Sequence, residues 1–441
     1  MLIDRITVNR CGLIGRLWEG EEESFIMKKL IVNILLIAFV TLRLTYALYE
    51  NYTMYSIMGK NLTHEKLANI LSENIKLIEE PGVHKQGLII AGPNHTAKLV
   101  KFFHNYRINY TVVTSNLHQY LKQQKSEDLS FRSANTLEHY LTYKEIQELL
   151  QEWSMFPGVT TRSIGQSVEK REIPVLQINV SPKKPAVVLE CGIHAREWIS
   201  HAACMNFAYT MIKNPCESIR KVSLYIVPVL NPDGYVVTHT TDRINRKNCG
   251  RPHPVDLNRN FDAGWKPKSH GGSPLYPGPK AFSEPESRAM KKLVESLGDQ
   301  LIFYLGLHSY GQKAMYPYGY TRKNAKTLEM HDQIADKAVE ILKCEPKTGC
   351  NRYRDSVYEY ESGAISKVMY LAYGSSVDWV YDSSKSGRKA AFAIELPPKG
   401  FIGTAGFLTS PKFINPVNRS FVPTVCGMIE ERLKFSDKYF I

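Results

Sequence analysis

Three short apolar runs constrain the fold more than any other feature of this sequence. They are residues 186–189, 301–307 and 390–394. Each has the length and the apolar character of a buried strand, and further strands are expected at residues 175–179 and 223–230. Helices are predicted near residues 144–153, 199–211, 284–296 and 327–342. Strands that alternate with helices favour an α/β fold in which helices cover both faces of one sheet.

Each of the three runs leads into side chains that can bind a metal ion. His194 and Glu197 follow the first run, His308 follows the second, and Glu395 ends the third. Sites in such sheets form beyond the carboxyl ends of the strands, so we expect these four side chains at one edge. A close pair with a distant third ligand is typical of catalytic zinc, which leaves one position for water. A carboxylate outside the ligand set can take the proton of that water, which predicts hydrolysis.

A single His-x-x-Glu pair would be weak support for this interpretation. Such pairs occur by chance in surface turns, and the chain carries a second, similar match at His253 and Asp256. The convergence of a third ligand and a base on the same edge is what favours a metal site.

Five motifs, taken in order, resemble those of the zinc metallocarboxypeptidases of the pancreatic A/B type. They are Gly-Ile-His-Ala-Arg-Glu-Trp-Ile-Ser at 192–200, Asn-Pro-Asp-Gly at 231–234, Asp-Leu-Asn-Arg-Asn-Phe-Asp-Ala-Gly-Trp at 256–265, His-Ser-Tyr at 308–310 and Phe-Ala-Ile-Glu-Leu at 392–396. The resemblance implies an α/β/α sandwich with a mixed eight-stranded sheet. It also implies a small antiparallel α+β activation domain in front of that sandwich.

By position in these motifs, the resemblance implies a role for each candidate residue. His194, Glu197 and His308 would bind one Zn2+ ion, and Glu395 would act as the general base. Arg246 would polarise the scissile carbonyl and stabilise the oxyanion, because it is a fixed cation at developing negative charge.

The resemblance also implies a site for the free carboxylate of a peptide C-terminus. Asn258 and Arg259 would supply an amide donor and a planar guanidinium fork, and Tyr370 would close over the substrate. Arg196 and Tyr310 would make two further contacts with the substrate. Asp256 would orient His194 from behind the metal site.

Val377 is expected at the floor of the specificity pocket, with Ile365, Ala372 and Gly319 beside it. Basic-specific members carry Asp at that place. A Lys or Arg side chain would find no carboxylate there, so the prediction is a preference for apolar or aromatic C-terminal residues. A shift of one position would put Asp378 in the pocket and reverse this conclusion. An apparent insertion at residues 383–388 leaves the finer specificity open.

The predicted organisation has four parts: an upstream extension (1–26), a signal peptide (27–47), an activation propeptide domain (48–132) and the catalytic domain (133–441). The signal has a basic start and a 13-residue apolar centre at 30–42, which is too short to span a membrane. The expectation is therefore a secreted, extracellular protein without a membrane anchor. Candidate glycosylation sites are Asn51, Asn61, Asn94, Asn109, Asn179 and Asn418.

The propeptide region is expected to combine helices and strands. Helices are predicted at 63–80 and 96–106, and strands at 87–91 and 110–114. A polar stretch at 123–128 then leads to Arg132, where a trypsin-like protease is expected to cut. The alternative is an ordinary linker that is not processed.

Seven of the 8 cysteines follow the predicted signal, so at least one is unpaired. Two pairs are candidates for disulfides. Some relatives link cysteines at the spacing of Cys191 and Cys204, and a bond between Cys344 and Cys350 could close a small loop. No partner is assigned to Cys216, Cys249 or Cys426.

The function predicted is the zymogen of a zinc carboxypeptidase that acts on peptide and protein C-termini and behaves as a monomer. Although the net charge is +13, Lys and Arg are scattered and no nucleic-acid motif appears, so no nucleic-acid partner is expected. Two alternatives are a basic-specific carboxypeptidase and an inactive relative that serves as a binding module. Retention of the ligands and the base argues against the second.

Overall fold

The computed structural model describes residues 49–58, 67, 70–72, 74–79, 87–131, 137–267, 271, 273–343, 359–384, 387–398 and 406–435. The chain divides into two units, Met1–Glu50 and Asn51–Ile441, and almost all described residues belong to the second. The predicted extension and signal peptide, the cleavage site at Arg132, and the Cys344–Cys350 pair lie outside the described residues. Among the described residues, no helix has both the length and the apolar character needed to cross a bilayer.

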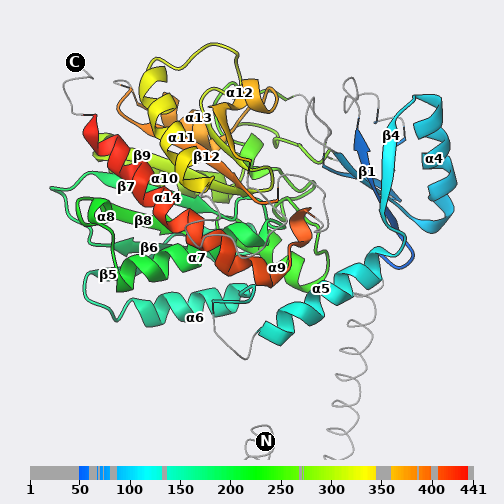
Figure 1. The fold of residues 1–441 in the computed structure, drawn as a ribbon, viewed down its shortest axis with the longest axis horizontal. Coiled ribbons are helices and arrows are strands. Elements are labelled where there is room, and N and C mark those ends of the chain that lie inside the picture. Colours follow the sequence, from blue (N-terminus) through cyan, green and yellow to red (C-terminus); the bar gives the residue numbers. More distant parts are fainter. Residues whose placement is uncertain are drawn as a thin grey trace, which may run out of the picture. The chain divides into compact units, whose positions relative to one another are not determined.

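The first described part is a small antiparallel sheet, of which Figure 1 labels β1 and β4 beside α4. Its strand order is β2-β3-β1-β4. Its elements are β1 (Thr53–Met58), β2 (Ile75–Glu79), β3 (Gly87–Ala91), α4 (Thr96–Asn105), β4 (Asn109–Thr114) and α5 (Leu117–Phe131). Leu99 and Phe103 of α4 pack with Ile57 and Ile89 of the sheet in one buried cluster. The predicted small antiparallel α+β fold is confirmed.

Strand β2 corrects one sequence-based prediction, because residues 75–79 were expected to end a helix. Ile75 pairs with Ala91 and Leu77 with Ile89 of β3. The apolar positions fit both a helical period and the two-residue period of a strand. Residues 75–79 form a strand because they pair with the buried strand β3. Tertiary contacts, and not local propensity, therefore select the conformation.

The second sheet has eight strands in the order β11-β10-β12-β9-β7-β8-β6-β5. The four central strands, β12, β9, β7 and β8, run parallel, whereas β10, β6 and β5 join by antiparallel pairs. The strands are β5 (Val159–Gln166), β6 (Glu172–Ile178), β7 (Ala186–Cys191), β8 (Ser223–Val227), β9 (Leu301–Ser309), β10 (Lys313–Tyr316), β11 (Glu361–Ala364) and β12 (Ala390–Leu396).

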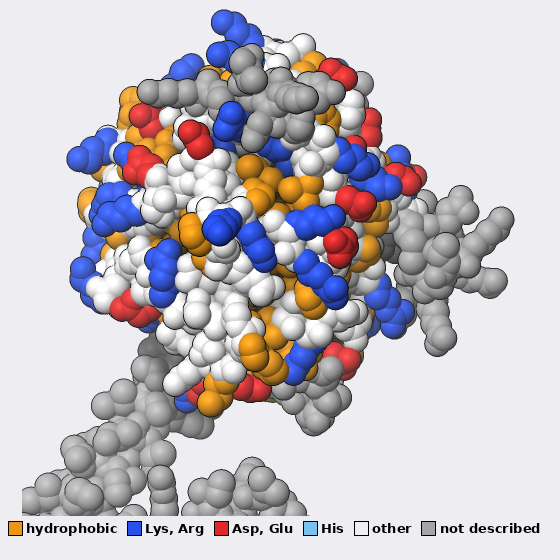
Figure 2. All heavy atoms as spheres, turned by 90° about the vertical axis from the view of Figure 1, so that its left-hand side faces the viewer, with side chains coloured by type: hydrophobic (Ala, Val, Ile, Leu, Met, Phe, Trp, Pro, Cys, Tyr) orange, Lys and Arg blue, Asp and Glu red, His pale blue; other side chains and the backbone are white. Residues whose placement is uncertain are grey.

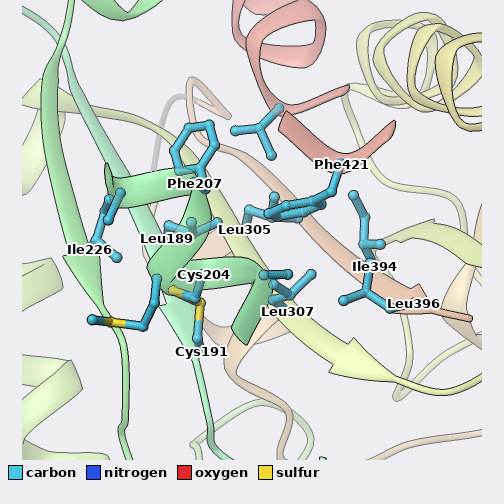
Figure 3. Packing of buried hydrophobic residues seen from close by; sticks show 14 of the residues in the cluster. Leu189, Cys191, Cys204, Phe207, Ile226, Leu305, Leu307, Ile394, Leu396 and Phe421 are labelled. Atoms are coloured by element: carbon cyan, nitrogen blue, oxygen red, sulfur yellow. A yellow bond between two sulfur atoms is a disulfide. The ribbon is translucent and has the colours of Figure 1, made fainter. Parts of the chain in front are cut away.

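Helices cover both faces of this sheet, which confirms the predicted α/β/α sandwich. The helices on one face are α6 (Tyr143–Trp153), α7 (Trp198–Lys213), α8 (Glu217–Arg220), α9 (Pro232–Thr240), α11 (Leu328–Leu342) and α14 (Ile414–Lys434). Those on the other face are α10 (Pro285–Leu297), α12 (Ile365–Val368) and α13 (Ser376–Asp382). Figure 3 shows Phe207 and Phe421 meeting Leu305 in the first of these two layers. On the face shown in Figure 2, Lys and Arg side chains are interspersed with Asp and Glu.

Two disulfides fix helices in the first layer. One joins Cys191 at the end of β7 to Cys204 in α7, and the other joins Cys216, beside α8, to Cys426 in α14. The second pair is 210 residues apart in the chain, a separation at which spacing indicates nothing about pairing. Cys249 forms no disulfide with any described cysteine.

His331 in α11 is a buried histidine whose protonation should affect the stability of this fold. Its Nδ1 lies 2.8 Å from the carbonyl oxygen of Thr327, and its Nε2 accepts the N–H of Ala391 at 3.3 Å, a pattern that requires a neutral ring. Burial lowers the pKa of His331 to about 4 from 6.5. Because the unfolded chain takes up this proton first, we expect the contribution of His331 to the free energy of unfolding to be complete above about pH 6.5 and to fall by about 3 kcal/mol by pH 4.

We expect His331→Gln to weaken this acid dependence, since an amide can donate and accept without titrating. Urea unfolding at pH 7 and pH 4.5 measures it, with the exposed His253→Gln as the matched control. An equal loss of stability in H331Q and wild type would contradict the assignment.

Candidate active site

The site lies where β7 ends, and its first turn depends on a glycine. Gly192 has φ +69°, and a Cβ atom there would lie 2.4 Å from Nε2 of the buried His201. Only glycine allows both the left-handed backbone and this close approach. The turn carries His194 and Glu197 out of the strand and into the start of α7.

Parallel neighbours bring the other two predicted side chains to the same edge. In the sheet register, Cys191 of β7 lies beside Leu307 of β9, and His308 of β9 lies beside Glu395 of β12. The carboxyl ends of β7, β9 and β12 therefore each lead to a functional side chain at the same edge, as expected for a parallel sheet.

His194, Glu197 and His308 form a compact group of possible metal ligands, with one donor atom from each within 4.8 Å of the others. Nδ1 of His194 lies 2.8 Å from Oε1 of Glu197, and Nδ1 of His308 lies 3.2 Å from Oε2 of Glu197 and 3.1 Å from Nδ1 of His194. All three side chains are buried. Two imidazoles and one carboxylate are a donor set that fits zinc.

Neighbouring groups orient these donors and keep the carboxylates charged. Asp256 Oδ1 lies 3.3 Å from His194 Nε2, and the Ser309 N–H donates to Glu197 Oε2 at 3.1 Å. Burial acts to raise the pKa of Asp256, but the Arg246 guanidinium outweighs it and holds that pKa well below its ordinary value. Burial likewise opposes ionisation of Glu197, yet the two imidazoles hold its pKa well below the ordinary value. A carboxylate behind a ligating histidine is the usual support of a zinc site.

The same pocket is lined by the predicted base and by the residues expected to hold a peptide C-terminus. These residues are Glu395, Arg246, Asn258, Arg259 and Tyr370. Arg259 Nη2 donates to the Tyr370 hydroxyl at 3.0 Å, and Arg246 Nε donates to Asp256 at 3.0 Å. The guanidinium groups are thus held in place at the pocket wall.

Arg196 and Tyr310, the two further predicted substrate contacts, are not among the described residues that line this pocket. Both are buried against Phe407, which does line it. The Arg196 guanidinium lies 4.0 Å from the centre of the Phe407 ring, and the Tyr310 ring meets it edge-on at 4.9 Å.

One wall of the pocket is apolar and contains Val377 together with Ile365 and Ala372. Asp378, the alternative to Val377, is fully buried and accepts the backbone N–H groups of Gly319 at 2.8 Å and Tyr320 at 3.0 Å. Burial raises the pKa of Asp378 to about 7. Gly319 therefore holds Asp378 and is not found among the lining residues described.

Six further residues line the pocket that the sequence pattern did not single out, namely Met315, Met369, Ala393, Ser309, Ser375 and Phe407. Ala393 could have been found, because it lies two positions before Glu395 on the same face of β12. Met315 is beside it in register on β10. Phe407 follows no strand or helix pattern, and nothing in the sequence distinguishes it.

The described residues contain a second group of possible donors, Glu169, Asp233 and Cys249. Arg171 pairs with both carboxylates of this group, at 2.7 Å from Asp233. Ser167 also donates to Asp233, at 2.6 Å. Both carboxylates of this group already pair with protein side chains, so the group is a weaker candidate for a metal site than His194, Glu197 and His308.

The chain is similar to known zinc carboxypeptidases in sequence and in structure. The zinc carboxypeptidase family profile matches residues 146–423, well over half of the chain. Carboxypeptidase A2 of Rattus norvegicus is 32% identical, covering 77% of this chain and 82% of its own length. Zinc carboxypeptidase A 1 of Drosophila melanogaster is 29% identical over 87% of this chain and 92% of its own.

Two solved structures share the fold over 88% of this chain. They are the carboxypeptidase A from Helicoverpa armigera (TM-score 0.78, 23% identity, 99% of that chain) and thrombin activatable fibrinolysis inhibitor (TM-score 0.75, 27% identity, 100% of that chain). The chain belongs to the zinc carboxypeptidase family and is a metallocarboxypeptidase of the A/B type.

Proposed function

We propose that this chain is the zymogen of a secreted zinc carboxypeptidase that removes apolar or aromatic residues from peptide C-termini. The observation that carries the proposal is the convergence of His194, Glu197, His308 and Glu395 on one pocket, from the ends of three adjacent parallel strands. A binding module without catalysis would need no base beside the three donors.

His194, Glu197 and His308 would hold the zinc ion. When bound, zinc would polarise the scissile carbonyl and lower the pKa of the attacking water. Glu395 would take the proton from that water and pass it to the leaving amine. Arg246, held by Asp256 and 3.7 Å from Glu197, would stabilise the negative charge that develops on the carbonyl oxygen.

The grip on a free carboxylate would make the enzyme an exopeptidase. Arg259 lies at the pocket wall with Asn258 beside it, and the Asn258 side-chain oxygen is fixed by the Ser376 N–H at 2.9 Å. A guanidinium can pair with a carboxylate through two parallel hydrogen bonds. Tyr370, bonded to Arg259 here, would move onto the substrate when the carboxylate takes its place.

Apolar specificity is supported by the wall that contains Val377 and by the burial of Asp378 on backbone amides. A Lys or Arg side chain of a substrate would meet no carboxylate among Val377, Ile365 and Ala372. Its charge would be buried without a partner, and this cost disfavours substrates that end in Lys or Arg.

Zymogen status is supported by the way α5 contacts the rest of the chain. The predicted linker stretch 123–128 lies inside this helix, and Gln124 is buried. Gln124 accepts from Arg243 Nε at 3.2 Å and donates to the Thr409 carbonyl at 3.3 Å. Arg243 in turn donates to the Phe407 carbonyl at 2.7 Å. A trypsin-like cut at Arg132, directly after α5, would free this helix to leave Arg243 and Thr409.

Turnover by the secreted chain before and after trypsin treatment tests the proposal. The substrates are peptides that end in Phe, Leu, Arg or Glu, each with and without a zinc chelator. We expect turnover only after trypsin, best with Phe and Leu, and its loss with chelator and return with Zn2+. Turnover that survives metal removal would contradict the proposal. No turnover after trypsin treatment would favour the binding module. A preference for peptides that end in Arg would favour the basic-specific alternative. Gel filtration checks the expected monomer.

A further inference from the structure

The turn that carries two of the proposed zinc ligands, residues 192–197, leads into α7 at Glu197. Glu197 is the N-cap residue of this described helix, and its side chain makes no capping hydrogen bond. Its carboxylate is turned instead to His194, His308 and the Ser309 N–H. An N-cap residue normally fixes its own position through its side chain. The backbone of Glu197 therefore needs other contacts to hold the carboxylate in place.

His201, one turn further along α7, supplies such a contact. Its Nδ1 lies 3.1 Å from the Glu197 carbonyl oxygen. A carbonyl oxygen can only accept, so Nδ1 carries a proton and donates it. The Ser200 N–H and hydroxyl donate to the same oxygen, at 3.0 and 2.7 Å. Three donors from the first turn of α7 thus hold the carbonyl of Glu197.

The His201 ring is itself fixed on two sides. An added Cβ atom on Gly192 would lie 2.4 Å from Nε2 and 2.8 Å from Cδ2, so the ring edge lies directly against the start of the turn. The ring stacks on Tyr235 of α9, with 4.0 Å between the centroids and 14° between the planes. Tyr235 is fixed in turn, because its hydroxyl donates to the Leu141 carbonyl at 2.5 Å. The ring of His201 therefore touches both ends of the turn, Gly192 and Glu197.

A role in packing alone accounts for His201 less well. The side chain is 1% exposed, and its Nε2 has no hydrogen-bond partner in the part of the chain that the structure describes. A buried polar atom without a partner costs stability, so an apolar side chain would pack there at lower cost. His331 of α11 is a contrast, because its Nδ1 faces the Thr327 carbonyl in the same way while its Nε2 accepts the Ala391 N–H. Among the described residues, the hydrogen bond of the His201 ring goes to a proposed zinc ligand.

We propose that His201 is a positioning residue of the zinc site, because it fixes the backbone of Glu197 and with it the direction of the ligand carboxylate. The inference rests on the proposed zinc carboxypeptidase function. The Glu197 N–H donates to the His194 carbonyl at 3.3 Å, so a shift of Glu197 also moves the second donor of the turn. Groups that orient metal ligands typically change metal affinity by about ten- to hundredfold. Loss of the His201 hydrogen bond should therefore speed the release of zinc.

The test measures the release of zinc from the full secreted chain, loaded with Zn2+, into an excess of a chelator that changes colour when it binds zinc. Asparagine and leucine have nearly the same shape and both lack the ring, but only asparagine can still donate to the Glu197 carbonyl. We expect His201→Leu to release zinc about tenfold faster than the wild type, and His201→Asn to stay within about threefold of it. His201→Met repeats the measurement if leucine does not fold, because methionine fills irregular core space.

His331→Leu is the matched control, because it removes the same kind of bond from a helix that carries no proposed ligand. It should lower the midpoint of thermal unfolding of the metal-free protein and leave the rate of zinc release unchanged. A change in folding stability alone would thus not reproduce the effect expected at His201.

The outcomes separate positioning from the proposed function. Release of zinc at the wild-type rate in folded H201L or H201M, or equally fast release in H201L and H201N, would overturn the inference. A wild-type chain that holds no zinc would overturn the proposed function and the inference with it. Zinc-loaded wild type that cleaves no peptide after trypsin treatment, together with fast release in H201L, would overturn the function and support the inference.

Discussion

Replacing Glu395 by glutamine is expected to lower kcat on a peptide ending in Phe by about a thousandfold, the range of a lost general base. Glutamine has nearly the same shape but cannot take a proton from the attacking water. Glu395 lies beside His308 in register and in the same pocket, yet it is outside the three-donor group. The variant should therefore keep its zinc while it loses turnover.

Steady-state kinetics and the zinc content of the purified variant measure these two effects separately. Glu148→Gln is the matched control, because Glu148 is an exposed side chain of α6 and should retain wild-type kcat. Retention of more than about a tenth of wild-type kcat in E395Q would contradict the role of base. Loss of zinc in E395Q would instead make Glu395 a ligand.

Val377→Asp is expected to change the preferred C-terminal residue from Phe to Arg. An aspartate at this position, in the apolar lining shared with Ile365 and Ala372, would be buried without a partner when the substrate side chain is apolar. It would pair with the guanidinium of an Arg side chain. We expect kcat/KM for Phe to fall by about a hundredfold and the Arg/Phe ratio to rise by about a thousandfold.

The control for the register of this wall is Asp378→Asn. Asp378 accepts backbone N–H groups of Gly319 and Tyr320, so its loss should lower stability and leave the order of preference unchanged. If D378N changes the preference and V377D does not, the register assigned to the pocket is wrong.

The metal group could be predicted because its signal is local. Gly192 forces the turn after β7, and apolar runs that stop at His308 and Glu395 mark strand ends. The carboxyl ends of parallel strands lie at one edge of the sheet, regardless of the conformation of the connecting loops. The order of the motifs then supplied the family and with it the count of eight strands.

The parts that could not be predicted depend on contacts between distant segments. Phe407, which supports Arg196 and Tyr310, lies in a stretch without regular periodicity. The Cys216–Cys426 disulfide and the contact of Gln124 with Arg243 each join residues more than 100 positions apart. Strand β2 was mistaken for helix because its pairing with β3, and not its own sequence, selects the conformation.

The central claim is that one zinc ion binds between His194, Glu197 and His308. Anomalous diffraction at the zinc absorption edge, from crystals of the secreted chain, tests it most directly. We predict a single strong peak between Nδ1 of His194, Nδ1 of His308 and the carboxylate of Glu197. A chain that binds zinc at Glu169 and Asp233 instead, or that shows no peak between the two imidazoles in crystals grown with zinc, would contradict the account.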